Sequence, residues 1–474
     1  MNAKKKRDFT EGPLFFRILT FTLPLMAVAM VQVLYNAADK IVVGQFSGDP
    51  NALGAIGSTS TVNAMIINLL IGLSGGAGVI TAQLYGAKRY AELRHAVSTA
   101  MIISLIGGVA FSIIGIAVAE PVMTLMTKSE LVASAALYVR ITCVGVPAVA
   151  VYNFASSIVR GVGDSKTPLL IGSLSGLINV GLNLIFVIAC DMSVDGVAWA
   201  TVISQYVSAI SIIIFLIKKR KECFGLDPKE IVLDRKLLGR TMILGIPQGI
   251  QSSVINLANM VCYATFSSAF SVTVISAGSV VGTLDIVVYT CMGCFSQAVT
   301  TFAGQNVGAR KPERAKRALL YSLVQVVATS ALISVLLRFI GPSTAELFLD
   351  AADPNRAEIL SLARENWFEF LCYFYFIHGI VSVLSGFVRG AGYSLSPTVC
   401  SFMGDAAAKV FWATLIFPIF SDSIKWYNLG HVTGWLVNLV LMTILTMIAT
   451  RRLDRISADD REQEAMREKN RLQL

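Results

Sequence analysis

The chain has 474 residues, of which 55% are hydrophobic and only 15% are charged, and its mean hydropathy is +0.67. Soluble proteins carry about 25% charged residues, so this composition excludes a soluble enzyme, a nucleic-acid-binding protein and a secreted disulfide scaffold. We therefore attribute the net charge of +9 to basic residues that gather on one side of a membrane.

Apolar segments of the length that crosses a bilayer, about 20 residues, recur along the whole chain. They predict an all-α polytopic membrane protein with twelve transmembrane helices. Residues 1–7 resemble the start of a signal peptide, but the apolar segment that follows is too long and lacks a cleavage site. We therefore expect an uncleaved first helix. In chain order the predicted spans are 14–41, 54–82, 96–119, 131–158, 168–190, 196–217, 238–265, 272–302, 318–341, 366–388, 397–420 and 428–450.

The basic residues alternate between the two sides that these spans define. Most of the 39 Lys and Arg residues fall in the tails and in every second loop. Because cytoplasmic loops carry the excess of Lys and Arg, we expect both termini in the cytoplasm.

Three pairs of similar segments, in the same order in each half, indicate an internal duplication. They are Gln83–Arg89 with Gln305–Lys311, Val159–Pro168 with Val388–Pro397, and Leu23–Pro24 with Ile246–Pro247. Each copy holds six predicted spans, an even number, so the copies run through the bilayer in the same direction and form a parallel repeat.

The duplication divides the chain into two six-helix lobes, predicted at 14–217 and 238–450. A cytoplasmic tail (1–13), a basic cytoplasmic linker (218–237) and a second cytoplasmic tail (451–474) complete the domain prediction. Two lobes of this kind meet at a central cleft and suit alternating access, which makes a transporter the predicted function.

Polar residues inside the first lobe predict an ion or substrate site, because a carboxylate within a span costs about 2.5–3.5 kcal/mol on insertion scales. Asp39 shares a helix face with Tyr35 and Asn36, and the fifth and sixth spans add Asn179, Asn183 and Thr201. Their oxygen atoms suit a proton or a small hard cation. Asp39, Asn179, Asn183 and Thr201 are the candidate ligands of Na⁺. Polar side chains also hold membrane helices together, which is the alternative interpretation.

The second lobe offers Asp285, Asp405 and Lys409 as candidates. Asp405 and Lys409 are four residues apart and are expected to form an ion pair along one helix, with Asp285 joining them or facing the cleft. The roles of Arg140, Glu369 and His378 stay open. Cys291 and Cys294 form a C-x-x-C in an apolar helix without a second pair, so they are interpreted as packing residues, and we expect no cofactor and no firm metal site.

Taken together, the segments Tyr35–Phe46, Arg160–Pro168, Gly196–Thr201 and Gln305–Ala309 resemble the multidrug and toxic compound extrusion (MATE) family, prokaryotic type. The resemblance implies two lobes arranged as a V, in the plasma membrane, that export organic cations in exchange for protons or Na⁺. It implies that Asp39 couples the ion to the substrate. Separately, we expect a monomer. The family often carries an aspartate at the position of Asn183, which leaves the coupling ion open.

Two alternatives are weighed against a drug antiporter. A flippase for lipids or lipid-linked oligosaccharides has similar lobes, but its cavity would be more cationic than the acidic and neutral candidates found here. An intramembrane serine protease is suggested by Gly72-Leu-Ser74-Gly75 with His378 as a base. Ser74 lies in a run of small residues typical of helix packing, and the two residues fall in opposite halves of the duplication.

Overall fold

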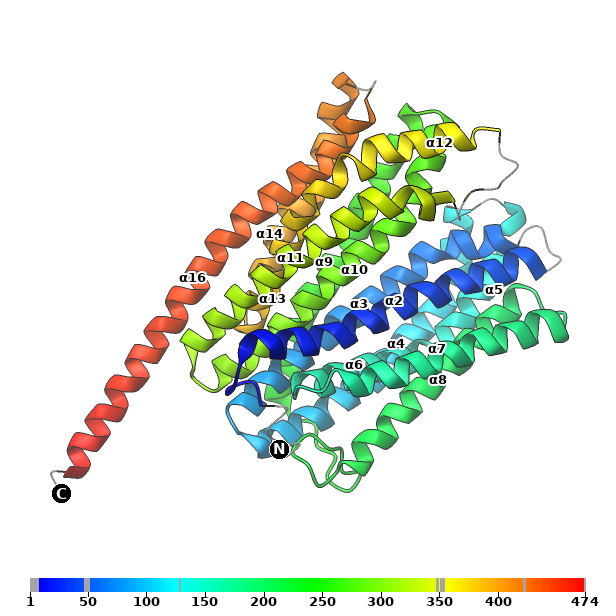
Figure 1. Cartoon of the computed structure of the whole chain (residues 1–474). Coiled ribbons are helices and arrows are strands. Elements are labelled where there is room, and N and C mark those ends of the chain that lie inside the picture. The colour runs from blue at the N-terminus through cyan, green and yellow to red at the C-terminus, as the bar shows by residue number, and fades with distance from the viewer. Residues whose placement is uncertain are drawn as a thin grey trace. The chain divides into compact units, whose positions relative to one another are not determined.

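The computed structural model describes residues 8–46, 52–127, 129–346, 349, 354–420 and 423–472, without the side chains of 32–46, 52–56, 60–61 and 457–472. Within these ranges the regular structure is helical and contains no strand (Figure 1). Each predicted span coincides with a helix or with a run of consecutive helices, so the all-α prediction is confirmed.

The first half of the chain begins with three helices of 33 to 37 residues. A bent pair, α5 and α6, follows and turns by 45° around Gly145. A Cβ atom at this position would collide with Oε1 of Gln205, so the bend is built on a residue without a side chain. The helices are α2 (Leu14–Phe46), α3 (Ala52–Gly86), α4 (Tyr90–Met126), α5 (Ser129–Val144), α6 (Val146–Gly161), α7 (Lys166–Leu184), the π-helix η1 (Ile185–Ala189) and α8 (Val194–Lys218).

The second half repeats the long helices but breaks its later spans into shorter segments. The helices are α9 (Arg235–Ala269), α10 (Val272–Gly308), α11 (Pro312–Glu346), α12 (Arg356–Ala363), η2 (Arg364–Phe368), η3 (Leu371–Phe374), α13 (Tyr375–Gly390), α14 (Leu395–Ser401), η4 (Phe402–Ala408), α15 (Lys409–Phe411), η5 (Trp412–Ile416), η6 (Phe417–Phe420) and α16 (Ile424–Leu472). Three of the short segments, η2, η4 and η5, are π-helices.

Ten helices among the described residues are long and apolar enough to cross a membrane, and the bent pair makes an eleventh. The predicted seventh span corresponds to α9, which is 35 residues long but is interrupted by polar residues such as Gln248, Gln251, Asn256 and Asn259. The chain is therefore a multi-span membrane protein whose seventh span is more polar than the others.

The chain forms two compact units. The amino-terminal unit comprises Leu23–Thr81 and Arg89–Asn256, and the carboxyl-terminal unit comprises Met1–Thr22, Ala82–Lys88 and Leu257–Leu474. Helices α2, α3 and α9 thus contribute residues to both units. Since the units do not follow the two sequence halves throughout, the lobe boundaries at 14–217 and 238–450 stay a prediction.

In the amino-terminal unit, α3 crosses the first part of α9 at glycines, so the two backbones lie in close contact. A Cβ atom at Gly72 would collide with the backbone of Gly249, and one at Gly76 would lie 2.8 Å from the amide nitrogen of Gly245. Helix association in lipid depends on such close packing, because burying apolar side chains gains nothing over lipid tails. The two glycine pairs therefore fix how these helices cross.

The loops that carry the sequence repeat share the same backbone geometry. Lys88 and Arg310 both adopt a left-handed conformation, with φ of 59° and 55°. The Gly-rich loops also agree, since Gly163 and Gly392 have φ of 91° and 100°, and each amide donates to an arginine carbonyl at 2.8 Å. A residue that ends a helix with positive φ is most easily a glycine. The structural match supports the duplication.

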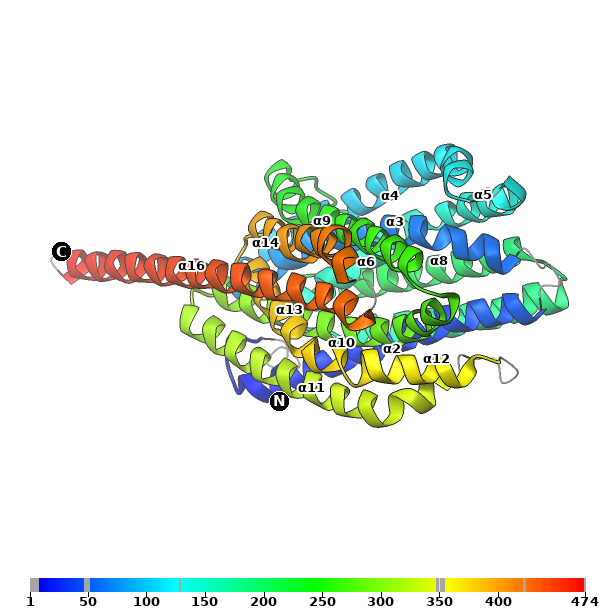
Figure 2. The same ribbon diagram turned by 90° about the horizontal axis from the view of Figure 1, so that it is seen from above.

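In the carboxyl-terminal unit, α10 packs against α11 and α13, and α13 packs against α16 (Figure 1). Figures 1 and 2 show the last part of α16 extending away from the other helices of this unit. Asp454 of α16 forms an ion pair of 2.6 Å with Lys316 of α11. This contact joins the carboxyl-terminal tail to the basic start of α11.

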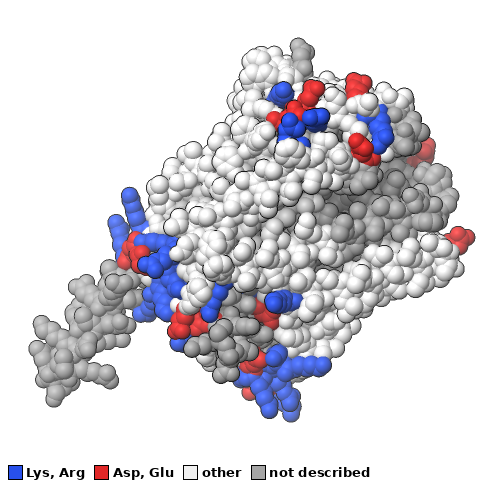
Figure 3. Space-filling model, in the orientation of Figure 1, with Lys and Arg blue, Asp and Glu red and all other residues white. Residues whose placement is uncertain are grey.

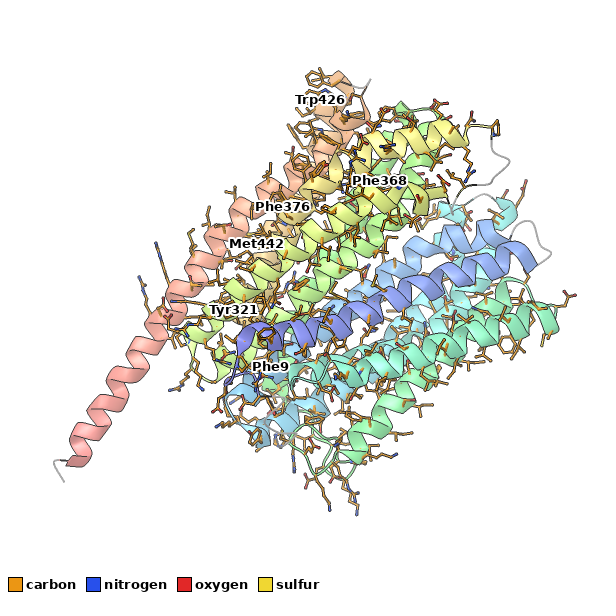
Figure 4. All side chains as sticks on the ribbon, in the orientation of Figure 1. Phe9, Tyr321, Phe368, Phe376, Trp426 and Met442 are labelled. Atoms are coloured by element: carbon orange, nitrogen blue, oxygen red, sulfur yellow. The ribbon has the colours of Figure 1, made fainter. Side chains whose placement is uncertain are left out.

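The segment before α2 is held by the same unit. The Phe9 ring, labelled in Figure 4, stacks on Phe302 with ring centroids 3.9 Å apart. The Phe9 amide donates to Oε1 of Gln305 at 2.9 Å, and its carbonyl accepts from Nε of Arg314 at 3.1 Å. Lys311 adds a bond of 3.0 Å to the carbonyl of Thr10. The repeat loop around Gln305 therefore anchors the start of the first span.

On the face of the carboxyl-terminal unit that Figure 3 shows, charged side chains gather at two opposite ends and the described surface between them is white. One end carries Lys316 and Asp454, and the other carries Arg338, Arg364 and Glu369. An apolar band between two charged ends is the surface that a bilayer-spanning unit requires.

We expect Gly72→Leu to destabilise the protein, because the new side chain has to displace the backbone of α9. Overpacking of a close contact typically costs about 1–3 kcal/mol. Thermal unfolding in detergent would measure the loss. Gly107→Leu is the matched control, since a Cβ atom at Gly107 meets nothing within 4 Å. Equal melting temperatures of the two variants would contradict the role of the crossing.

Candidate functional site

Three of the residues predicted for the first-lobe site lie together in the amino-terminal unit. Nδ2 of Asn183 donates to Oδ1 of Asn179 at 3.4 Å, and Nδ2 of Asn179 donates to Oγ1 of Thr201 at 3.3 Å. Asn183 is completely buried, and Asn179 is 3% exposed. Asn179 and Asn183 are one turn apart on α7, and Thr201 faces them from α8. The three side chains thus form a chain of polar groups inside an apolar helix pair.

The remaining members of this predicted site are Tyr35, Asn36 and Asp39. All three belong to α2, but their side chains lie outside the described residues. Their part in the site therefore stays a prediction.

The second-lobe candidates also occupy one region, within the carboxyl-terminal unit. Asp285 of α10 accepts a hydrogen bond from the hydroxyl of Tyr375 of α13. Asp405 of η4 accepts a bond of 2.5 Å from Nδ2 of Asn438 of α16. Lys409 of α15 lies within electrostatic range of both Asp285 and Asp405. Four spans therefore place their charged and polar side chains around a common region.

The predicted ion pair between Asp405 and Lys409 is wrong. Among the ion pairs of the described residues none joins these two, and Nζ of Lys409 instead donates to Oδ1 of Asn259 of α9 at 2.7 Å. The reason is the π-helix η4, which spans Phe402–Ala408 and ends just before Lys409. A π-helix closes hydrogen bonds between residues five apart rather than four, so the direction of Lys409 relative to Asp405 differs from that in an α-helix.

Aromatic rings surround these charges. The ring of Tyr289 lies 4.8 Å from that of His378 and 6.2 Å from that of Trp435. Trp435 in turn lies 6.0 Å from Tyr375 and 6.2 Å from His431. Aromatic faces attract cations and planar ligands, and these rings lie on α10, α13 and α16, the helices that also carry Asp285, Tyr375 and Asn438.

The residues whose roles the sequence left open fall into two groups. Arg140 pairs with Glu120 at 2.7 Å, and Glu369 pairs with Arg338 at 3.0 Å and with Arg364 at 2.9 Å. These contacts are partly exposed ion pairs between neighbouring helices or within one helical run, and they account for the charges structurally. His378, by contrast, belongs to the aromatic group around Trp435.

The serine of the protease alternative is part of helix packing. Oγ of Ser74 donates to the carbonyl of Ile71 at 2.8 Å and accepts from Ser157 at 3.2 Å. Its neighbour Gly72 forms the crossing with α9. Ser74 belongs to the amino-terminal unit and His378 to the carboxyl-terminal unit, and among the described residues the ring of His378 has Ser382 as its hydrogen-bond partner.

Within the described part of the chain, no group of three or more His, Cys, Asp or Glu side chains is arranged to hold a metal ion. Cys291 and Cys294 are buried within α10, as expected for small packing residues.

Comparison with known families gives two matches to one family model, described as MatE, over residues 24–185 and 247–407. The matches begin at Pro24 and Pro247, which are equivalent positions of the duplication. The chain belongs to the multidrug and toxic compound extrusion (MATE) family. It is therefore a membrane transporter and not an enzyme, and the family resemblance of the sequence motifs is confirmed.

Curated relatives align along most of the chain. "Probable multidrug resistance protein YpnP" of Bacillus subtilis is 26% identical over 84% of this chain and 87% of its own length. An "FAD transporter" of Shewanella oneidensis is 26% identical over 76% of this chain and 79% of its own length.

Solved structures show the same fold. A structure described as the outward-facing conformation of a multidrug resistance MATE family transporter superposes with a TM-score of 0.88 at 22% identity. The match covers 96% of this chain and 100% of the other. This confirms a MATE fold of two repeated helical halves.

Tyr375, His431, Trp435 and Asn438 of this MATE transporter were not predicted from the sequence as site residues. A signal for the last three was present, because Asn428, His431, Trp435 and Asn438 recur every three or four residues along the last predicted span. This spacing places polar and aromatic groups on one helix face. Tyr375 gave no such signal, since a tyrosine in an apolar span is common.

We expect Asn438→Leu to destabilise the transporter, because it leaves the Asp405 carboxylate without its donor on α16. An unsatisfied buried polar group typically costs about 1–3 kcal/mol, and a charged one more. Thermal unfolding in detergent provides the measurement. The double variant Asp405→Leu/Asn438→Leu should lose less than Asn438→Leu alone, since both polar partners are then removed. Equal losses would show that Asn438 acts through packing only.

Proposed function

We propose that this MATE protein is a secondary antiporter that exports small organic cations in exchange for protons or Na⁺. The observation that carries the proposal is the buried chain Asn183–Asn179–Thr201 in a family member whose α2 carries Asp39. Amide, hydroxyl and carboxylate oxygens together suit a proton or a small hard cation. The names of the relatives, which include multidrug resistance and FAD transport, support a small organic molecule as cargo.

In the proposed mechanism Asp39 changes its partner during each cycle. When the site is dry, the neutral form of the acid is favoured and Asp39 holds a proton; an arriving organic cation favours the anion and the proton leaves. Na⁺ could replace the proton with Asn179, Asn183 and Thr201 as further ligands. Competition for one carboxylate then couples the two fluxes.

Alternating access would expose this site to each side of the membrane in turn. We propose that the two repeated halves, 14–217 and 238–450, are the moving parts, working as a monomer in the prokaryotic plasma membrane. The distribution of Lys and Arg supports cytoplasmic positions for both termini. The transporter would need no cofactor besides its coupling ion.

Asp39→Asn is expected to abolish gradient-driven export, because an amide cannot exchange a proton for a cation. Efflux of a fluorescent organic cation from proteoliposomes with an imposed pH or Na⁺ gradient would measure this. Asp227→Asn is a matched control, since Asp227 lies in the linker and only caps a turn through the amide of Lys229. Unchanged transport by Asp39→Asn would remove Asp39 from the mechanism.

Asn183→Asp should make transport more dependent on Na⁺, because it adds a negative charge beside Asn179 and Thr201. The measurement is the initial rate of export against Na⁺ concentration at constant pH. Asn153→Asp on α6 adds the same charge to the same unit, at a side chain that donates only to the carbonyl of Val149. An identical Na⁺ response in both variants would count against an ion at Asn183.

A further inference from the structure

A short segment before α2, residues 8–12, is bound through its main chain, and we call it the strap. All five of its carbonyl oxygens accept hydrogen bonds of 2.6 to 3.1 Å from cationic side chains. The pairs are Arg17 with Asp8 and Glu11, Arg314 with Phe9 and Gly12, and Lys311 with Thr10. Hydrogen bonds from ionised donors are about twice as strong as those between neutral groups. These main-chain contacts therefore hold the strap firmly.

Phe9 adds a buried side chain to these contacts. It is 3% exposed, stacks on Phe302 and meets the ring of Phe21 edge to face, with ring centroids 5.5 Å apart. The completely buried side chains of Gln305 and Asn306 bond to its amide and its carbonyl, respectively. Any slide or rotation of the strap would break several of these contacts at once.

The strap leads directly into α2. Pro13 alone separates it from Leu14, the first residue of the helix, and the proline ring fixes φ at that link. α2 has 33 residues and is about 50 Å long. A spanning helix takes its tilt and rotation from packing and from anchors at its ends, because lipid tails offer no directional contacts. The strap is such an anchor for α2.

The same helix carries Asp39. Its first part, up to Thr22, belongs to the carboxyl-terminal unit together with the strap, and the remainder from Leu23 belongs to the amino-terminal unit. A slide of α2 by one residue would move Asp39 by about 1.5 Å along the axis and turn it by about 100°. A preorganised site tolerates displacements of about 0.5 Å, so the register of α2 determines whether Asp39 can act.

The segment before α9 is the repeat equivalent of the strap. At the spacing of the paired Leu-Pro and Ile-Pro segments, Phe9 corresponds to Val232. Oγ1 of Thr99 on α4 donates to the Val232 carbonyl at 3.3 Å and accepts from the Asp234 amide at 3.0 Å. A neutral hydroxyl thus stands where the strap has cationic donors, and Val232 is 42% exposed. The start of α9 is held less firmly than the start of α2.

At the same spacing Asp39 corresponds to Cys262 of α9, which is not an acid. Of two equivalent helices, the one with the carboxylate has the firmly bound start, and the one with the cysteine has the weakly bound start. This difference links the strap to the acid, since a strap needed only to begin a helix would be expected before both.

We propose that Arg314 and Lys311 are positioning residues for transport, which set the depth and rotation of Asp39 by holding the strap. They contact the main chain of the strap and act on the ion site through α2. The inference rests on the proposed function for the role of Asp39. It extends that function by giving the basic residues at the start of α11 a part in the transport cycle.

Hydrogen exchange of the purified full-length transporter, measured by mass spectrometry on the peptide that contains Phe9, tests the contacts of the strap without transport. Arg314→Gln removes two charge-assisted hydrogen bonds, so we expect exchange of the strap to become about tenfold faster. Arg314→Lys keeps the charge and should restore most of the protection. Arg317→Gln, at an exposed arginine of the same helix, is the matched control and should exchange like the wild type. Unchanged exchange in Arg314→Gln would overturn the proposal.

Export of a fluorescent organic cation by proteoliposomes under an imposed ion gradient tests the effect on transport. We expect Arg314→Gln to lower the maximal rate about tenfold, because a misplaced group far from the reacting atoms slows a cycle by such factors. The KM for the cation and the melting temperature should stay unchanged, since the variant alters neither the cargo contacts nor the helix core. Lys311→Gln loses one bond to the strap and should lower the rate less, and Arg314→Lys should recover it.

A wild-type maximal rate in Arg314→Gln, in spite of faster exchange of the strap, would overturn the positioning role. A loss of rate matched by a loss of melting temperature would do the same, because it would show a structural role only. Failure of the antiporter mechanism is distinguishable from both, since it appears as normal export by Asp39→Asn with unchanged exchange of the strap.

Discussion

Close approach of helix backbones at α3 is the constraint on which the structure depends. In the amino-terminal unit Gly72 and Gly76 bring α3 against Gly249 and Gly245 of α9. In the carboxyl-terminal unit the end of the same helix meets α10, where a Cβ atom at Gly86 would strike the carbonyl of Gln305 and one at Gly308 would strike that of Gln83. Because lipid offers no hydrophobic gain for burying larger side chains, these small residues determine which helices can touch and at what depth.

The two units bond their polar side chains in different ways. In the amino-terminal unit the neutral side chains of Asn183, Asn179 and Thr201 are linked by hydrogen bonds. In the carboxyl-terminal unit Asp405 and Lys409 bond to the neutral amides of Asn438 and Asn259, and no ion pair joins the two within the described residues. One half of the duplicated fold thus contains a region of neutral polar groups, and the other contains a region of mixed charge. The two regions are expected to differ in the ligands they favour.

The sequence predicts the fold well because composition and spacing determine it. The positions of the spans follow from apolar length, and the duplication is visible in the loops that end at Lys88 and Arg310. The π-helices are not predictable in this way, since a hydropathy window does not register one extra residue per turn. One such turn, η4, contains Asp405 and ends just before Lys409, and the two side chains bond to different helices instead of to each other. The polar face of α16 from Asn428 to Asn438 was readable from its spacing, whereas the bond between Tyr375 and Asp285 depends on two helices distant in sequence.

The glutamines of the repeated loops, Gln83 and Gln305, have taken different partners since the duplication. Gln83 donates to the carbonyl of Gly390 at 3.0 Å, whereas Gln305 accepts from the amide of Phe9. Phe9 is consequently held by the carboxyl-terminal unit. Affinity tags or fluorescent fusions joined close to Phe9 would disturb that unit, so the opposite terminus is the safer place for them.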